Sequence, residues 1–138
     1  MLLEENKRLI GKYYENMWNG WDFSVADEII HPDIEFRGSI GLTVKGRDGF
    51  KGYMNTIRAA FPDFHNTIEE LVAEGDSVVA VLTYSGTHRG TLFGVAPTGK
   101  RIQYVGTAIF RIEAGQVTRG WVLGDTLSLL QQLGAVAP

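Results

Sequence analysis

Residues 104–134 read YVGTAIFRIEAGQVTRGWVLGDTLSLLQQLG, and they are the most informative part of the sequence. Two runs rich in β-branched and aromatic residues meet at the turn EAG (113–115), which is short enough to join only antiparallel neighbours. After Trp121 the chain breaks at residues 124–125 into a short apolar segment that ends at Gly134, as a helix closed by glycine does. The stretch therefore predicts a β-hairpin followed by a short C-terminal helix.

The same β pattern extends upstream to Pro62. Residues 64–74, 76–88, 100–112 and 116–123 are rich in Val, Ile, Thr, Tyr and Phe. Turn or loop sequences at 74–76, 91–99 and 114–115 separate these runs. Four strands joined in this way predict an antiparallel meander.

Before Pro62 the apolar residues recur at helical spacing. The pattern predicts a first helix that begins at Leu2 and ends at Asn19-Gly20, and a second helix over 23–31. A third helix ends at Pro62 and carries the apolar face Phe50, Tyr53, Met54, Ile57 and Phe61. Ser24 is the expected N-cap of the second helix, and Pro32 stops that helix. A short strand over 33–37 and a loop over 38–46 precede the third helix.

Helices followed by a long meander predict one α+β domain over residues 1–138, with the helices on one face of a curved sheet. The other face of the sheet also needs cover. Tyr84, Val105 and Ile109 are the candidates for apolar residues on that face. We therefore expect a homodimer, or a tetramer, built sheet against sheet.

Composition excludes several function classes. The net charge is −3 and no basic stripe occurs, so we expect no nucleic-acid partner. No apolar run is long enough to span a membrane, and the N-terminus lacks the pattern of a signal peptide. There is no cysteine, the three histidines lie far apart, and no phosphate-loop or dinucleotide motif occurs. We therefore expect a cytoplasmic protein with no metal and no cofactor.

Five segments occur in a fixed order through the last two-thirds of the chain. They are FPDFH (61–65), AEGD (73–76), GTHRG (86–90), GVAPTGK (94–100) and residues 121–134. Together with the first helix and GRDGF (46–50), they resemble the SnoaL-like polyketide cyclases and predicted ester cyclases of the nuclear transport factor two superfamily. The resemblance implies a cone-shaped α+β roll, in which a curved, mostly antiparallel sheet wraps around three N-terminal helices.

The resemblance also implies a pocket between the sheet and the helices, open at one end. Polyketide cyclases of this type close a ring by intramolecular aldol addition without cofactor or metal. Their acid/base is an Asp in the last strand, directly after the Trp. In this sequence Val122 follows Trp121, so that role cannot be transferred, and the nearest acid is Asp125.

Asp125 is the first candidate for a general acid/base. A lone carboxylate at the end of a buried strand is costly to bury unpaired, and a raised pKa is the usual response. The competing interpretation is structural, with the Asp125 side chain capping the last helix at the amide of Leu127 or Ser128. Both roles can coexist.

Histidines and one arginine are the other polar candidates. His88 ends its strand, where an imidazole could donate to an oxyanion or share a proton with Asp125, or could bind loop carbonyls instead. His65 begins a strand, and its face is left open. Glu35 and Arg37 share a face of the first strand. They lie at the pocket mouth if that face is concave, whereas the alternation of apolar residues around them favours an outer salt bridge.

The aromatic residues indicate the ligand class. Tyr14 and Trp18, one turn apart on the first helix, are the residues we expect to face the ligand. Further expected ligand contacts are Met54, Phe93, Tyr104 and Trp121, together with Arg37 and His65. A pocket of this composition suits a small, flat or alicyclic apolar metabolite that carries a few oxygens.

These observations favour a cofactor-independent enzyme that closes a ring, isomerises or hydrates such a metabolite by acid/base catalysis. A non-catalytic binding module and a dimerisation domain are the alternatives. Epoxide hydrolases of this roll need an Asp–Arg–Asp set, of which Asp125 and Arg37 could be two members. Ketosteroid isomerases need a tyrosine and two acids in the pocket, and Tyr14 is available whereas Ala108 offers no acid.

Overall fold

The computed structural model describes residues 2–138. The elements in chain order are α1 (Leu2–Lys12), the π-helix η1 (Tyr13–Asn19), α2 (Phe23–Ile29), β1 (Ile30–Arg37), β2 (Thr43–Lys45), α3 (Gly46–Ala60), β3 (His65–Glu74), β4 (Ser77–Thr87), β5 (Arg101–Glu113), β6 (Gln116–Gly124) and α4 (Thr126–Gln132).

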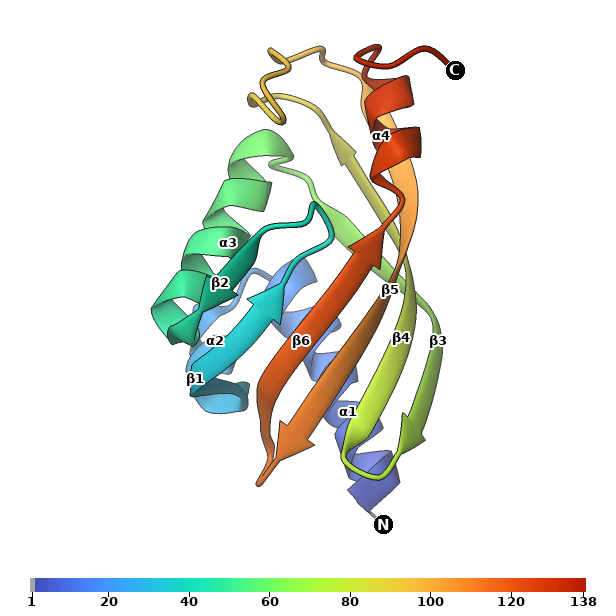
Figure 1. Cartoon of the computed structure of the whole chain (residues 1–138). Coiled ribbons are helices and arrows are strands. Elements are labelled where there is room, and N and C mark those ends of the chain that lie inside the picture. The colour runs from blue at the N-terminus through green and yellow to red at the C-terminus, as the bar shows by residue number, and fades with distance from the viewer. Residues whose placement is uncertain (1) are drawn as a thin grey trace.

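The strands form one open, curved sheet in the order β2-β1-β6-β5-β4-β3. Every neighbouring pair is antiparallel except β1 and β6, which run parallel. Helices α1, α2 and α3 lie on one side of the sheet, and α4 stands at its end beside β5 (Figure 1). The α+β roll predicted from the sequence is confirmed.

Local boundaries differ from the sequence prediction between residues 22 and 45. Asp22, not Ser24, is the N-cap of α2, and its carboxylate accepts from the Ser24 amide at 2.9 Å. The first strand already begins at Ile30, because Pro32 ends the helix but fits an extended backbone. The predicted loop contains β2, which pairs with the end of β1.

Strand alternation separates the two faces of the sheet. Even-numbered residues of β5 are buried and odd-numbered ones are exposed. Val105 and Ile109 lie on the outer, exposed face as predicted, at 54% and 45% exposure. The placement of Tyr84 on that face is wrong, since Tyr84 is 3% exposed and packs inward.

Glycines at two positions leave room for inward aromatic rings to pack directly against the backbone. A Cβ at Gly38 would lie 2.0 Å from Cζ of Tyr53, and one at Gly120 would lie 2.7 Å from the Phe36 ring. These side chains therefore occupy the volume that any larger residue would need.

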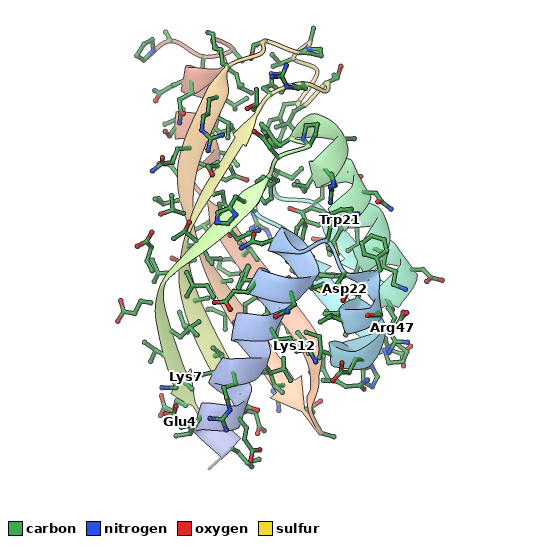
Figure 2. The ribbon with its side chains drawn as sticks, turned by 180° about the vertical axis from the view of Figure 1, so that it is seen from behind. Glu4, Lys7, Lys12, Trp21, Asp22 and Arg47 are labelled. Carbon is green, nitrogen blue, oxygen red and sulfur yellow. The ribbon has the colours of Figure 1, made fainter. Side chains whose placement is uncertain are left out.

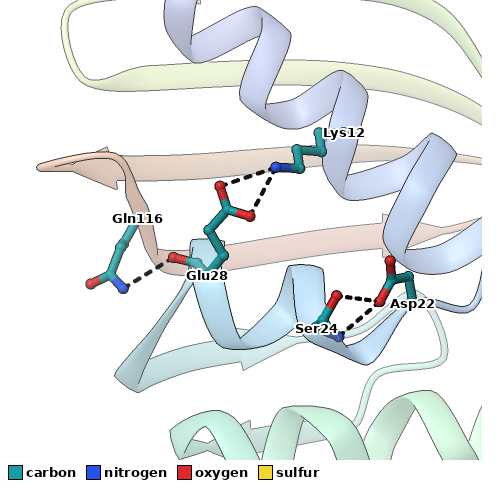
Figure 3. Close-up of polar contacts among 5 residues, drawn as sticks. All are labelled: Lys12, Asp22, Ser24, Glu28 and Gln116. Carbon is teal, nitrogen blue, oxygen red and sulfur yellow. Dashed lines mark hydrogen bonds and ion pairs between the residues drawn. The ribbon is translucent and has the colours of Figure 1, made fainter.

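Polar contacts tie the helices together at the outside (Figure 3). Nζ of Lys12, the last residue of α1, binds the Glu28 carboxylate of α2 at 2.9 Å. The Gln116 side chain donates to the Glu28 carbonyl at 3.3 Å, which links α2 to the start of β6. The ion pair is exposed, so it adds little to the stability of the fold.

The π-helix η1 continues α1 with a wider turn. The Gly20 amide donates to the Glu15 carbonyl at 3.0 Å, five residues earlier. Tyr13, Tyr14 and Trp18 are buried on its inner side. Wide turns of this kind are frequent at functional sites, and η1 forms one wall of the cavity described below.

Among residues 2–138, none of the helices combines the length and the apolar character needed to cross a membrane.

Candidate functional site

A small cavity lies between the sheet and the helices. Its volume is about 20 Å³, enough for one water molecule. The lining residues are Tyr13, Tyr14, Trp18, Phe36, Ser39, Tyr53, Ile57, Phe64, Asn66, Tyr84 and Val122. They come from η1, β1, α3, β3, β4 and β6 and from the segments that follow β1 and α3, so all layers of the fold contribute.

All five tyrosines of the sequence gather at this cavity. Four of them line it directly. The fifth, Tyr104, packs on Tyr84 with ring centroids 4.8 Å apart, and its hydroxyl is 2.9 Å from Oγ of the lining residue Ser39. The hydroxyl groups are thereby concentrated in one place inside an otherwise aromatic core.

Burial raises the pKa of every one of these tyrosines. Desolvation is the largest cause in each case, and the other phenols add a smaller repulsive effect at every one of them except Tyr53. A raised pKa keeps a phenol neutral at physiological pH. The tyrosines are therefore hydrogen-bond donors in the cavity and not bases.

The cavity has no carboxylate, histidine, lysine or arginine in its lining. Val122 faces it from β6, opposite Ala108 of β5 in the antiparallel register. The position after Trp121 thus points inward, but it carries an apolar side chain. The polar groups left are hydroxyls, the indole N–H of Trp18 and the amide of Asn66.

Asn66 is held in place by Asn19. The Asn19 side chain donates to the Asn66 carbonyl at 2.8 Å and accepts from the Asn66 amide at 2.8 Å. This pair imitates a strand pairing and fixes the end of η1 against β3. The Asn66 side chain, 4% exposed, is buried at the cavity wall.

The acid/base interpretation of Asp125 has no support in this geometry, because its side chain does not line the cavity. Asp125 is exposed and caps α4 by accepting from the Ser128 amide at 3.1 Å. The backbone amide of Asp125 donates to the Val105 carbonyl at 2.9 Å, so the pairing with β5 continues through Asp125. Its side chain therefore lies on the outer face, with Trp121 and Leu123. The structural interpretation of Asp125 as a helix cap is confirmed.

The structure does not bring His88 to Asp125 or to the cavity. His88 is fully buried, packs against Phe61 at 5.9 Å, and accepts from the Thr98 amide through Nδ1 at 3.2 Å. Its Nε2 is the one buried side-chain nitrogen or oxygen without a hydrogen-bond partner in residues 2–138. The ring therefore ties the start of the β4–β5 loop to its end at Thr98, and a catalytic role for it has no support in this geometry.

Arg37 and Trp121 lie on the outer face and not in the pocket. The Arg37 guanidinium sits 5.3 Å from the Trp121 ring and donates to the Val122 carbonyl. Phe36 is buried, as the outer-face alternative for this strand requires. The ion pairs of residues 2–138 do not include the expected pair of Arg37 with Glu35.

The remaining ligand candidates fall into two groups. Tyr14 and Trp18 line the cavity, and Tyr104 is joined to it through Ser39. The others lie elsewhere: Met54 on the buried side of α3, His65 exposed at the start of β3, and Phe93 exposed in the β4–β5 loop. Binding by any of them stays a prediction.

Sequence reasoning missed Ser39, Asn66 and Tyr84 as lining residues. Ser39 and Asn66 stand next to turns and carry no local signal. Tyr84 belongs to β4, where apolar residues occupy both faces between Val78 and Leu82. The inward face of that strand could not be chosen from alternation alone.

A second hollow adjoins the cavity on the outside. Its volume is about 190 Å³, and Trp18, Trp21, Arg58, Phe64 and His65 are among its lining residues. No group of three or more His, Asp or Glu side chains in the described chain is arranged to hold a metal ion.

Solved structures with the same fold include three proteins from Streptomyces species. AclR from Streptomyces galilaeus, a proposed hydroxylase, is 30% identical with a TM-score of 0.84, over 99% of this chain and 85% of its own. IdmH from Streptomyces antibioticus, a proposed polyketide cyclase, is 28% identical with a TM-score of 0.81, over 94% and 98%. TsrD from Streptomyces laurentii is 28% identical with a TM-score of 0.84, over 94% and 95%.

A search among curated proteins found no match. The family model of the SnoaL-like polyketide cyclases, in contrast, matches residues 8–133. Because this match spans nearly the whole chain, the protein belongs to the SnoaL-like polyketide cyclase family.

Proposed function

We propose that the protein takes up a small, flat, apolar molecule with carbonyl or hydroxyl oxygens in the tyrosine-lined cavity and converts it without a cofactor. The observation that carries the proposal is the convergence of five neutral phenols on one uncharged aromatic cavity. Family membership and the similarity to proposed cyclases support ring closure or isomerisation as the reaction class.

The chemistry available to this lining is donation, confinement and exclusion of water. A phenol that donates to a carbonyl stabilises the negative charge that develops on its oxygen when an enol forms or a new C–C bond closes. Aromatic walls hold a flexible chain in the folded shape that ring closure needs. The proton that leaves carbon passes to the bound water, and the water returns a proton to the phenol as the phenol gives its own to the carbonyl oxygen, so this relay needs no charged base.

Val122 separates this proposal from carboxylate-driven aldol chemistry. The acid expected in polyketide cyclases of this type would stand at position 122, and valine cannot take a proton. The reaction we propose therefore relies on the tyrosine hydroxyls, and Asp125 is left as a helix cap.

A second candidate is a non-catalytic binding protein with the same ligand. The uncharged lining and the volume of about 20 Å³ favour it, because any ligand larger than a water must first displace side chains. Trp18 and Phe64 are the wall residues next to the outer hollow, so their movement would enlarge the space.

The test uses a panel of bicyclic and tricyclic ketones and phenols. Wild-type protein should show ligand-induced thermal stabilisation and, for the enzyme, a product of changed mass or retention by liquid chromatography and mass spectrometry. Tyr14→Phe and Tyr84→Phe keep the rings but remove the donors, so turnover should fall ~10²–10³-fold, the effect of losing one oxyanion donor.

Thr107→Val is the matched control, since it removes a hydroxyl from the exposed face of β5. Stabilisation without any product would leave the binding protein as the function. Absence of stabilisation by the whole panel would contradict both candidates.

A further inference from the structure

The outer hollow lies where η1 ends, between the last turn of α3 and the start of β3. Figure 2 shows Trp21 and Asp22 at this end of the first helix, on the side of α3. The hollow of about 190 Å³ is larger than the cavity behind it. It is lined by two tryptophans, a histidine, the guanidinium of Arg58 and the carboxylate of Asp63, a composition unlike that of the uncharged interior.

Only two side chains belong to both spaces. Trp18 and Phe64 line the cavity and the outer hollow, with ring centroids 6.0 Å apart. They form the partition between the two. A molecule longer than the cavity would therefore pass between these rings and leave its other end in the outer hollow.

Arg58 supplies the positive charge of the outer hollow. Its guanidinium lies 4.2 Å from the centre of the Trp21 ring, and none of the ion pairs in residues 2–138 includes it. A guanidinium stacked on an indole keeps the N–H groups at its edge free for a carboxylate.

The nearby acid does not neutralise this charge. The Asp63 carboxylate accepts from the Thr87 amide at 2.6 Å and from the Thr87 hydroxyl at 2.7 Å, and it pairs with Arg101 at 3.4 Å. These hydrogen bonds lower the pKa of Asp63, the bond from the Thr87 amide most of all. Asp63 is thus committed to β4 and β5, and Arg58 remains available to a ligand.

The platform under Arg58 is strained and fixed. Trp21 has a φ of 53°, a left-handed conformation that is rare for a bulky residue and persists only where its surroundings enforce it. Here the Asn19–Asn66 hydrogen bonds hold the chain to β3 two residues before Trp21. Strain of this kind gathers at ligand-binding sites.

We infer that the outer hollow binds the carboxylate end of an amphipathic acid whose flat apolar body enters the tyrosine-lined cavity. The inference rests on the proposed function for the body of the ligand and adds the class of substrate, an aryl or polycyclic carboxylic acid. Arg58 holds the carboxylate, Trp21 orients the guanidinium, and the Trp18–Phe64 partition admits the body.

The experiment compares 2-naphthylacetate with its methyl ester by isothermal titration calorimetry. Wild-type protein should bind the acid at least ~10-fold more tightly than the ester, within the range of a charge-assisted hydrogen bond. Arg58→Gln should abolish this preference and leave the affinity for the ester unchanged. Arg8→Gln, the same charge change at an exposed residue of α1, should keep the preference.

Val122→Phe fills the cavity and separates this inference from the proposed function. Loss of ester binding in that variant supports uptake into the cavity, and Val122→Leu replaces it if the larger variant fails to fold. Ester binding without preference for the acid, or a preference that survives Arg58→Gln, overturns the inference while the proposed function stands. Binding of neither probe to wild-type protein overturns both.

Discussion

The side chain at position 122 determines what the cavity can do at the residue scale. Alternation along β6 places Val122 inward and Trp121 outward, and the same alternation carries Asp125 to the outer side. The residue directly after the last tryptophan is therefore the one that points into the cavity. This also shows why a nearby acid three residues further along cannot replace the acid of the polyketide cyclases.

Asp125 should behave as a helix cap. Asp125→Ala should lower the free energy of unfolding by about 1 kcal/mol, the usual value for loss of an N-cap, whereas Asp125→Asn should change it little. Both variants should retain ligand binding and turnover on any substrate of the panel. Chemical denaturation and a rate assay check this, and a fall in turnover of Asp125→Asn by ~100-fold would return the residue to catalysis.

An acid placed at position 122 should make stability depend on pH. Burial in the cavity would raise the pKa of the carboxyl in Val122→Asp. As the pH rises past about 4, the unfolded chain ionises and the folded one does not, so the variant should lose about 1.4 kcal/mol per pH unit until the folded carboxyl also ionises. Urea denaturation at pH 4 and pH 7 measures this loss.

Val122→Asn is the control for that measurement, since it has no titrating group. The free energy of unfolding of Val122→Asn should differ from that of the wild type by the same amount at pH 4 and at pH 7. Equal pH dependence in the acid and the amide would mean that position 122 is solvated and that the cavity is open to water.

At the scale of elements, the junction between η1 and β3 supports both hollows. Asn19→Ala removes the three hydrogen bonds to Asn66 and leaves buried backbone groups unpaired, so the free energy of unfolding should fall by about 1–3 kcal/mol. Asn16→Ala, exposed on the same helix, should change it much less. Hydrogen exchange of the Asn66 amide should accelerate only in the first variant, and unchanged protection there would contradict the anchoring role.

The elements differ in how far the sequence determined them. The hairpin of β5 and β6 has strict alternation and a glycine turn, so its strands and faces could be predicted. In β4 the residues from Val78 to Leu82 are apolar on both faces, which hid Tyr84. The π-helix could not be predicted, because inward residues at 13, 14, 17 and 18 also fit a regular α-helix.

The tyrosine cluster has a consequence for the stability of the whole molecule. Because burial raises the pKa of each phenol above 10.0, the folded chain keeps protons that the unfolded chain releases above that pH. Stability should therefore be fully present below about pH 10 and fall as the pH rises further. Phenolate absorbance should rise together with the loss of circular dichroism, and titration of the phenols before unfolding would contradict their burial.

The outer face of the sheet bears on the assembly of the molecule. Val105, Ile109, Trp121 and Leu123 are all between 38% and 54% exposed on adjacent strands, an apolar surface typical of an interaction site. The homodimer expected from the sequence stays a prediction. Light scattering should give twice the mass of one chain, Ile109→Glu should give the monomer, and Leu2→Glu on the opposite side should not. A monomeric wild-type chain would end this prediction.

The wide turn of η1 affects how the chain is compared with others. A turn closed between residues five apart holds one residue more than a regular helical turn closed between residues four apart. A homologue with a straight helix here would be one residue shorter before Trp18. If the two sequences are aligned without a gap, every residue upstream is paired with a residue about 100° away around the helix axis. Chimaeras that exchange α1 should therefore be aligned by counting backwards from Trp18 and not forwards from the N-terminus.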